Sequence, residues 1–213
     1  MMIKVCGMRD AENIREVEAL GIDLMGFIFW PKSSRYVSER PTYLPTQCKR
    51  VGVFVDEDIE TVTRIADEYA LDFVQLHGHE TPSYCAQLNG KHLIKAFNIA
   101  TAADFEATKP YEGIVDHFLF DTKGKSVGGN GEKFDWNVLK DYVGETPFIL
   151  SGGIGPDDAE LLTSFSDQGQ SVALRTLLSL TSKNCIGIDL NSKFEDAPAL
   201  KNIQKLKTFL EQL

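Results

Sequence analysis

Short apolar runs separated by stretches of helical period constrain the fold of this chain more than any other feature of its sequence. The runs are apolar nearly throughout rather than alternating, as is typical of parallel strands that are covered on both faces. There are eight of them, and they lie at Ile3–Cys6, Leu24–Phe29, Arg50–Val55, Phe73–Leu76, Leu93–Phe97, Phe118–Phe120, Phe148–Leu150 and Ile186–Leu190. A chain of this pattern is expected to form one parallel sheet with helices on its outer face.

Helix candidates lie between the runs. The clearest is Asp58–Ala70, in which five apolar side chains have the spacing of one helical face. The others are Ala11–Ala19, Pro82–Leu88, Trp136–Tyr142, Asp157–Ser164 and Leu200–Leu213. Strands that alternate with helices predict right-handed strand–helix–strand units.

Eight strands with intervening connectors in 213 residues predict an α/β protein, a (β/α)8 TIM barrel, as a single domain over residues 1–213. An open doubly wound sheet is the alternative, but it usually begins with a Gly-rich GxGxxG turn. The first turn here is Cys6-Gly7-Met8 instead. The stretch Thr163–Asn184 is longer than a barrel requires at this point, and its structure is not predicted.

Composition excludes several classes of protein. A net charge of −9 argues against a nucleic acid as the main partner, because phosphate backbones need a cationic surface. No apolar run approaches the roughly 20 residues that span a membrane, so we expect a cytoplasmic protein. The four cysteines have no CxxC spacing, which indicates reduced thiols rather than a disulfide framework or a zinc site.

The chemistry of a barrel lies at the carboxyl ends of its strands. The first strand ends in Cys6 and the sixth in Asp121, which we expect on opposite sides of the ring of strands. A thiol and a carboxylate facing a substrate at the barrel mouth could act as general base and general acid. Taken singly, Cys6 is equally compatible with core packing, and Asp121 with a helix cap.

Other strand ends suggest where a substrate binds. Gly152 and Gly153 after strand seven would let the backbone approach a phosphate closely, although a tight turn alone also explains them. Strand eight ends in Asp189-Leu190-Asn191-Ser192, and we expect Asp189, Asn191 and Ser192 to bind substrate. The further candidates are Arg35 for an anion and Gln75 and His77 as polar lining of the pocket.

Two other features carry weaker hypotheses. His77 and His79 form a pair in QLHGHE, but no further ligand stands at metal spacing, so no metal site is predicted. Gly128–Gly131 is expected to form a mobile loop over the substrate, or else a plain connector.

Taken together, these segments resemble the phosphoribosylanthranilate isomerase family, whose members are TIM barrels of tryptophan biosynthesis. The matching stretches cover nearly the whole chain in the family's order. They are KVCGM (4–8), GFIFWPKSSRYV (26–37), VGVFV (51–55), VQLHGHE (74–80), IKAF (94–97), FDTKGKSVGGNGEKFDW (120–136), ILSGGIGPDDA (149–159) and GIDLNSKFE (187–195).

The resemblance implies a reaction and roles for individual residues. The reaction would be the Amadori rearrangement of N-(5'-phosphoribosyl)anthranilate, an aminoaldose, to the corresponding 1-deoxyribulose aminoketose. Asp121 would be the general acid that opens the furanose ring, and Cys6 the general base that takes the proton from C2'. Arg35 would contact the anthranilate or its carboxylate, and the loops at Gly152-Gly153 and Asn191-Ser192 would hold the phosphate. No metal or organic cofactor is implied, and the chain is expected to be a monomer or a homodimer.

The sequence departs from the family pattern mainly after strand eight. Lys193 stands where the family has a glycine, and Pro198-Ala199 where it has Pro-Gly. Asp158 stands where the family often has asparagine. Lys193 therefore leaves the backbone geometry of this loop open.

Two rival functions remain. The first is another phosphosugar barrel, either an epimerase or a synthase that uses a strand-end lysine as acid, for which Lys4 and Lys95 are available. The second is a ligand-binding or regulatory barrel that has lost catalysis, which would not need the pair Cys6 and Asp121.

Overall fold

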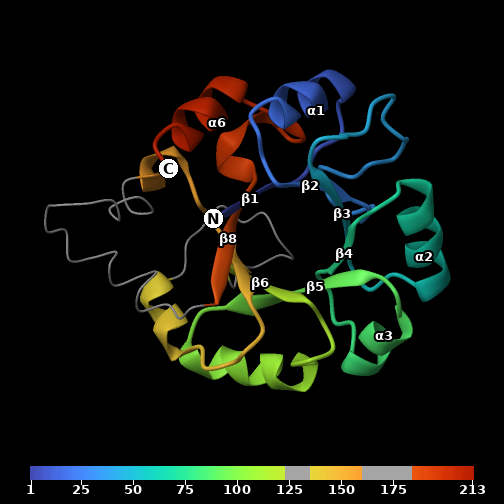
Figure 1. Cartoon of the computed structure of the whole chain (residues 1–213), viewed down its shortest axis with the longest axis vertical. Coiled ribbons are helices and arrows are strands. Elements are labelled where there is room, and N and C mark those ends of the chain that lie inside the picture. Colours follow the sequence, from blue (N-terminus) through green and yellow to red (C-terminus); the bar gives the residue numbers. More distant parts are fainter. Residues whose placement is uncertain (123–134, 160–183) are drawn as a thin grey trace, which may run out of the picture.

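The computed structural model describes residues 1–122, 135–159 and 184–213. Its eight strands close into a barrel of parallel neighbours in sequence order, with β1 pairing β8 to complete the ring. The strands are β1 (Met2–Val5), β2 (Leu24–Ile28), β3 (Lys49–Phe54), β4 (Phe73–Leu76), β5 (His92–Ile99), β6 (His117–Thr122), β7 (Phe148–Leu150) and β8 (Cys185–Leu190). This confirms the predicted TIM barrel, and Figure 1 shows the helices arranged around its outside.

The helices begin where the sequence places side-chain caps. The Asp10 carboxylate accepts hydrogen bonds from the amides of Glu12 and Asn13 at the start of α1, and Asp58 caps α2 in the same way. The α-helices described are α1 (Ala11–Glu18), α2 (Ile59–Glu68), α3 (Pro82–Gln87) and α6 (Ile203–Leu210). Each cap satisfies amide groups that the first helical turn leaves without a partner.

Four 3₁₀ helices lie within the described residues. They are η1 (Ala102–Tyr111), η2 (Trp136–Asp141), η3 (Pro156–Asp158) and η4 (Ser192–Phe194). The helix predicted at Trp136–Tyr142 therefore appears as η2. Of the helix predicted at Asp157–Ser164, Asp157 and Asp158 lie in η3 and Ala159 is α-helical. The remainder of the second helix lies outside the described residues, as does Thr163–Asn184 apart from Asn184 itself.

The segment after β8 differs from the prediction. The helix expected over Leu200–Leu213 begins only at Ile203, because Leu200–Lys201 (β10) pairs antiparallel with Glu195–Ala197 (β9). The side chain of Asn13 in α1 fixes this hairpin, since it accepts a hydrogen bond from Lys201 N at 2.7 Å and donates one to Lys201 O at 2.9 Å.

The barrel has two apolar layers. An outer layer between strands and helices holds most of the buried side chains. A smaller inner cluster fills the barrel, formed by Leu24, Val51, Phe73, Ile94, Ala96, Leu119 and Ile149. Residues two apart along a strand share a face, so the polar residues farther along the strands face the barrel interior at its carboxyl end.

Candidate active site

Cys6 lies at the carboxyl end of β1 with its thiol inside the barrel. Its amide donates to Leu190 O at 2.9 Å, which continues the β1–β8 ladder by one residue. The sulfur rests against the next strand, where a Cβ placed on Gly26 would come within 2.6 Å of Sγ. Only glycine at this position leaves room for the thiol.

A charged group lies directly below Cys6. Lys4 is fully buried, and its Nζ donates to Asp189 Oδ1 at 2.8 Å. The second oxygen of Asp189 accepts a hydrogen bond from Ser151 Oγ at 3.2 Å. Burial raises the pKa of the Cys6 thiol above its ordinary value, and the Lys4 ammonium offsets part of that effect. Asp189, expected to bind substrate, is thus held by two side chains inside the barrel.

Asp121 is the penultimate residue of β6 and has a histidine as its neighbour. Asp121 Oδ2 lies 3.5 Å from Nε2 of His77, and both side chains are nearly buried. Gln75 Nε2 lies 3.0 Å from the other ring nitrogen of His77. The structure therefore brings the expected acid together with both predicted pocket residues of β4 and its loop.

The placement of Cys6 and Asp121 differs slightly from the expectation. β1 and β6 are separated by β7 and β8 in the ring, so they are three positions apart rather than the four of opposite strands. Both residues still lie at the carboxyl end of the barrel, and between them come Ser151, which directly follows β7, and Asp189 of β8.

The glycines after β7 have left-handed backbone conformations. Gly152 has φ +88° and Gly153 φ +72°, which L side chains rarely adopt. A Cβ on Gly152 would lie 2.2 Å from Thr122 Oγ1 and 3.0 Å from Asp121 Oδ1. The turn thus packs against the end of β6, so the expected phosphate-binding turn and the expected acid are neighbours.

Arg35 forms a partly buried ion pair that sequence reasoning missed. Its Nε and Nη2 donate to the Glu195 carboxylate at 2.9 and 2.6 Å, and Glu195 Oε1 lies 2.5 Å from Lys201 Nζ. Lys201 also donates to Asn191 Oδ1 at 2.9 Å. Although burial opposes it, the hydrogen bond from Arg35 and the charge of Lys201 lower the pKa of Glu195. Glu195 and Lys201 thereby connect two predicted binding residues.

The loop after β8 tolerates its departures from the family pattern. Ser192 and Lys193 lie in η4, and among the described residues only Asp56, Ala70 and Ala199 have positive φ without being glycine. Lys193 therefore needs no unusual backbone angle. Ala199 has φ +65°, the conformation that a glycine would favour there.

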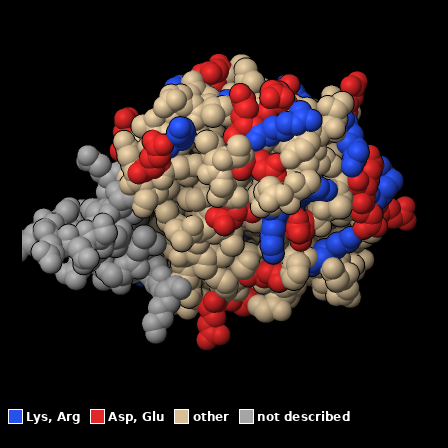
Figure 2. Space-filling model, turned by 45° about the horizontal axis from the view of Figure 1, so that its top comes forward, with Lys and Arg blue, Asp and Glu red and all other residues tan. Residues whose placement is uncertain are grey.

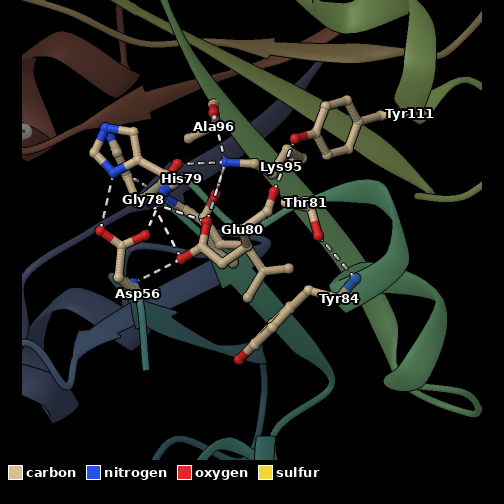
Figure 3. A network of polar contacts seen from close by, with 12 residues as sticks. Asp56, Gly78, His79, Glu80, Thr81, Tyr84, Lys95, Ala96 and Tyr111 are labelled. Atoms are coloured by element: carbon tan, nitrogen blue, oxygen red, sulfur yellow. Dashed lines mark hydrogen bonds and ion pairs between the residues drawn. The ribbon is translucent and has the colours of Figure 1, made fainter. Parts of the chain in front are cut away.

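Lys95 is excluded as an acid at the barrel mouth by its direction. It points outward from β5, where Nζ lies 3.1 Å from Glu80 Oε2 and 2.8 Å from Gly78 O (Figure 3). Glu80 in turn accepts from the amides of Asp56 and Gly78. Lys95 thus fixes the loop that carries His77. It is therefore not available as the strand-end lysine acid of the rival synthase function.

Metal ligands, membrane spans, cysteines and surface charge bear on the classes of protein considered above. Among residues 1–122, 135–159 and 184–213, no cluster of three or more His, Cys, Asp or Glu side chains could hold a metal ion, and no helix is long and apolar enough to cross a membrane. All four cysteines are free thiols. On the face seen in Figure 2, acidic and basic side chains are interspersed rather than gathered into a basic patch. Gly128–Gly131 lies outside the described residues.

The family model and two similar curated relatives name the same family. Residues 3–212 match the family model described as N-(5'-phosphoribosyl)anthranilate isomerase. The chain is 49% identical to the N-(5'-phosphoribosyl)anthranilate isomerase of Phocaeicola vulgatus, over 100% of this chain and 98% of that protein. It is 48% identical to the protein of the same name from Parabacteroides distasonis, over 100% and 93% of the two chains.

Solved structures agree with this result. The phosphoribosyl anthranilate isomerase of Thermus thermophilus superposes with a TM-score of 0.79 at 28% identity, covering 100% of this chain and 98% of that one. A phosphoribosyl anthranilate isomerase in complex with reduced 1-(o-carboxyphenylamino)-1-deoxyribulose 5-phosphate superposes with a TM-score of 0.75 at 26% identity, covering 100% and 97%.

Proposed function

The chain belongs to the N-(5'-phosphoribosyl)anthranilate isomerase family, and from this premise we propose that Cys6 is the general base and Asp121 the general acid of its reaction. The reaction is the Amadori rearrangement of N-(5'-phosphoribosyl)anthranilate to 1-(2-carboxyphenylamino)-1-deoxyribulose 5-phosphate, a step of tryptophan biosynthesis. Both chemical steps are proton transfers, so the proposal requires no metal or organic cofactor.

The proposed mechanism moves one proton at each of two atoms. Asp121 donates its proton to the furanose ring oxygen, the bond from C1' to that oxygen breaks, and the nitrogen lone pair forms a Schiff base. Cys6 as thiolate then removes the proton from C2', and the electron pair of that bond gives an enolamine. Tautomerisation of the enolamine to the ketone completes the aminoketose. The observation that carries this assignment is the placement of a buried thiol and a buried carboxylate at the same end of the barrel.

His77 supports the role of Asp121. The histidine Nε2 is 3.5 Å from the carboxylate, and Gln75 fixes the ring from the other side. The ring can thereby orient the Asp121 carboxylate at the mouth of the barrel. We therefore propose that Gln75 and His77 line the substrate pocket beside the general acid.

The remaining predicted residues are proposed to bind the two anionic ends of the substrate. Arg35 uses Nε and Nη2 for Glu195, which leaves Nη1 for the anthranilate carboxylate. Gly152, Gly153, Asn191 and Ser192 lie at adjacent strand ends, where backbone amides would bind the phosphate. A product analogue with the same carboxylate and phosphate is bound by a related isomerase, in agreement with this assignment.

The proposal is tested by generating phosphoribosylanthranilate in situ and following the loss of anthranilate-type fluorescence. We expect rapid decay with the parent protein and a loss of roughly 10²–10⁴-fold in kcat for Asp121→Asn and for Cys6→Ser. Matched controls are Asp116→Asn and Cys48→Ser, which change the same residue types at the amino-terminal end of the barrel and should retain the parent rate. Near-parent rates in folded Asp121→Asn or Cys6→Ser would refute the assigned roles.

The ligand-binding alternative has a distinct signature. A barrel that only binds would hold the reduced product analogue but give no fluorescence decay.

We further propose that the protein is cytoplasmic, with reduced thiols, that it forms one domain over residues 1–213, and that it is a monomer or a homodimer. Sedimentation equilibrium of the purified chain decides between these two assemblies.

A further inference from the structure

Lys4 is an unusual residue for the interior of a barrel. It is fully buried, it lies two residues before Cys6 on the same face of β1, and below it the barrel is filled with apolar side chains. Its ammonium group lies near two side chains that differ in charge and chemistry. Nζ is 2.8 Å from Asp189 Oδ1, and its charge acts on the thiol of Cys6, the next residue on the same face of the strand.

Stability alone does not account for this arrangement. The desolvation of two buried charges roughly cancels their attraction, and well-packed apolar side chains are often as stable as a buried ion pair. Asp189 is also held by Ser151 at 3.2 Å, so the pair is fixed in one geometry. Lys4 and Asp189 share one neighbour, the sulfur of Cys6, on which both of their charges act.

We propose that Lys4 and Asp189 are positioning residues that control the proton affinity of Cys6. The ammonium of Lys4 stabilises the thiolate that the reaction needs as its base. Asp189 keeps Lys4 protonated and aimed, and its own negative charge opposes the thiolate. The two residues therefore act on Cys6 with opposite signs. This inference rests on the proposed role of Cys6 as base.

Other charges face Cys6 as well. Lys201 of β10 lowers its pKa, and the guanidinium of Arg35 from the loop after β2 is coupled to the same thiol. Both of these cations are bound to Glu195, whereas Lys4 lies on β1 itself, two residues before Cys6. Burial lowers the pKa of a lysine, but Asp189 and Cys6 together raise that of Lys4, so Lys4 stays charged beneath the thiol.

The test measures the thiolate itself. Absorbance at 240 nm is titrated with pH for each protein and for the same protein carrying Cys6→Ser, and the difference reports Cys6 alone. We expect Lys4→Met to decrease the thiolate fraction and Asp189→Asn to increase it, with midpoints displaced in opposite directions by about one pH unit or more. The pKa of the general base that kcat/KM against pH reports should move in the same two directions. Lys49→Met at the other end of the barrel should move neither.

A second comparison covers the case in which Lys4→Met does not fold because Asp189 is left as an unpaired buried charge. The double variant Lys4→Met/Asp189→Asn removes both charges of this pair, and the asparagine can still accept from Ser151. It differs from Asp189→Asn only at Lys4, so its thiolate fraction should be the lower of the two.

The outcomes separate this inference from the proposed function. Midpoints that move in the same direction, or that do not move in folded variants, would overturn the role of Lys4 and Asp189 even if the parent isomerises its substrate. Opposite displacements in a protein that does not turn over phosphoribosylanthranilate would keep the electrostatic role and refute the proposed role of Cys6 in that reaction.

Discussion

Ala70 occupies a backbone conformation that is unfavourable for alanine. It directly follows Tyr69, the C-cap residue of α2, and its φ is +47°. Helices commonly end in a glycine with this left-handed conformation. Left-handed geometry costs an L residue roughly 1–2 kcal/mol, whereas the greater freedom of unfolded glycine costs about 0.4–1 kcal/mol. We expect Ala70→Gly to raise the free energy of unfolding by roughly 0.5 kcal/mol, measured by urea denaturation.

The control for this prediction is Ala107→Gly. Ala107 is exposed in η1 and does not have positive φ, so glycine there should be destabilising by roughly 0.5–1 kcal/mol. The same sign of change for both variants would contradict the argument from backbone conformation.

Individual site residues were predictable to different degrees. Cys6 and Asp121 stand at strand ends, and because strand ends meet at one rim of a barrel, their shared location follows from the sequence. The surroundings of Asp189 could not be predicted in this way. The alternation of side chains along β8 shows which face of the strand Asp189 is on, but not which residue it contacts. Lys4 is 185 residues away in sequence. Glu195 was likewise missed, because the only signal for its contact with Arg35 was a pair of opposite charges 160 residues apart.

Arg35 is held by a carboxylate that can be changed without moving the backbone. Glu195→Gln keeps an oxygen acceptor but removes the charge that fixes the guanidinium. We expect KM for phosphoribosylanthranilate to rise about tenfold or more while kcat changes less, because Arg35 is proposed to bind substrate and not to transfer protons. Steady-state kinetics measures both constants, and a fall in kcat at unchanged KM would contradict this division.

At the level of elements, β5 is joined to the loop after β4 by the buried pair of Lys95 and Glu80 (Figure 3). Removing one partner of such a pair leaves an uncompensated buried charge and typically costs 3–5 kcal/mol. We expect Glu80→Gln to lower the free energy of unfolding by about 3 kcal/mol. The double variant Glu80→Gln/Lys95→Met should cost less than the sum of the single variants by about 1–3 kcal/mol.

Urea denaturation of the four proteins of this cycle gives the coupling energy directly. The exposed pair of Arg64 and Glu68, with 3.4 Å between its charged atoms, provides the control. A cycle at that pair should give less than about 0.5 kcal/mol. A comparably small coupling for Lys95 and Glu80 would show that they do not act as a unit.

The strands were the most predictable elements. β4 and β7 have the predicted bounds, and the others differ by at most two residues at an end, because long apolar runs between polar turns leave few alternatives. The hairpin of β9 and β10 was not predicted. Leu200 continues the apolar period of α6, but Asn13 of α1 binds both backbone groups of Lys201. A contact across 188 residues thus overrides a local helical pattern.

For the whole molecule, several buried or half-buried carboxylates make stability dependent on acid. Burial opposes ionisation of Glu18, but the hydroxyl of Tyr43 and the amides of Gln47 and Thr46 lower its pKa. Arg35 and Lys201 lower the pKa of Glu195, and burial again opposes this effect. A carboxylate with a lowered folded pKa stabilises the protein fully above the unfolded value of about 4.3. That contribution is lost as the pH falls through the folded pKa.

The sign of this linkage gives a prediction for Glu195→Gln. The variant should be less stable than the parent at pH 7, because Arg35 and Lys201 lose their common anion. The difference in free energy of unfolding should shrink progressively below about pH 4, where Glu195 of the parent is protonated first in the unfolded chain and then, at lower pH, in the folded protein. Urea denaturation at pH 7, 5, 4 and 3 measures the difference. The control Glu12→Gln removes an exposed carboxylate 3.3 Å from Arg15 and should match the parent closely at each pH. A difference for Glu195→Gln that stays constant from pH 7 to 3 would mean that the packing of the side chain, and not its charge, holds the loop after β8 to the barrel.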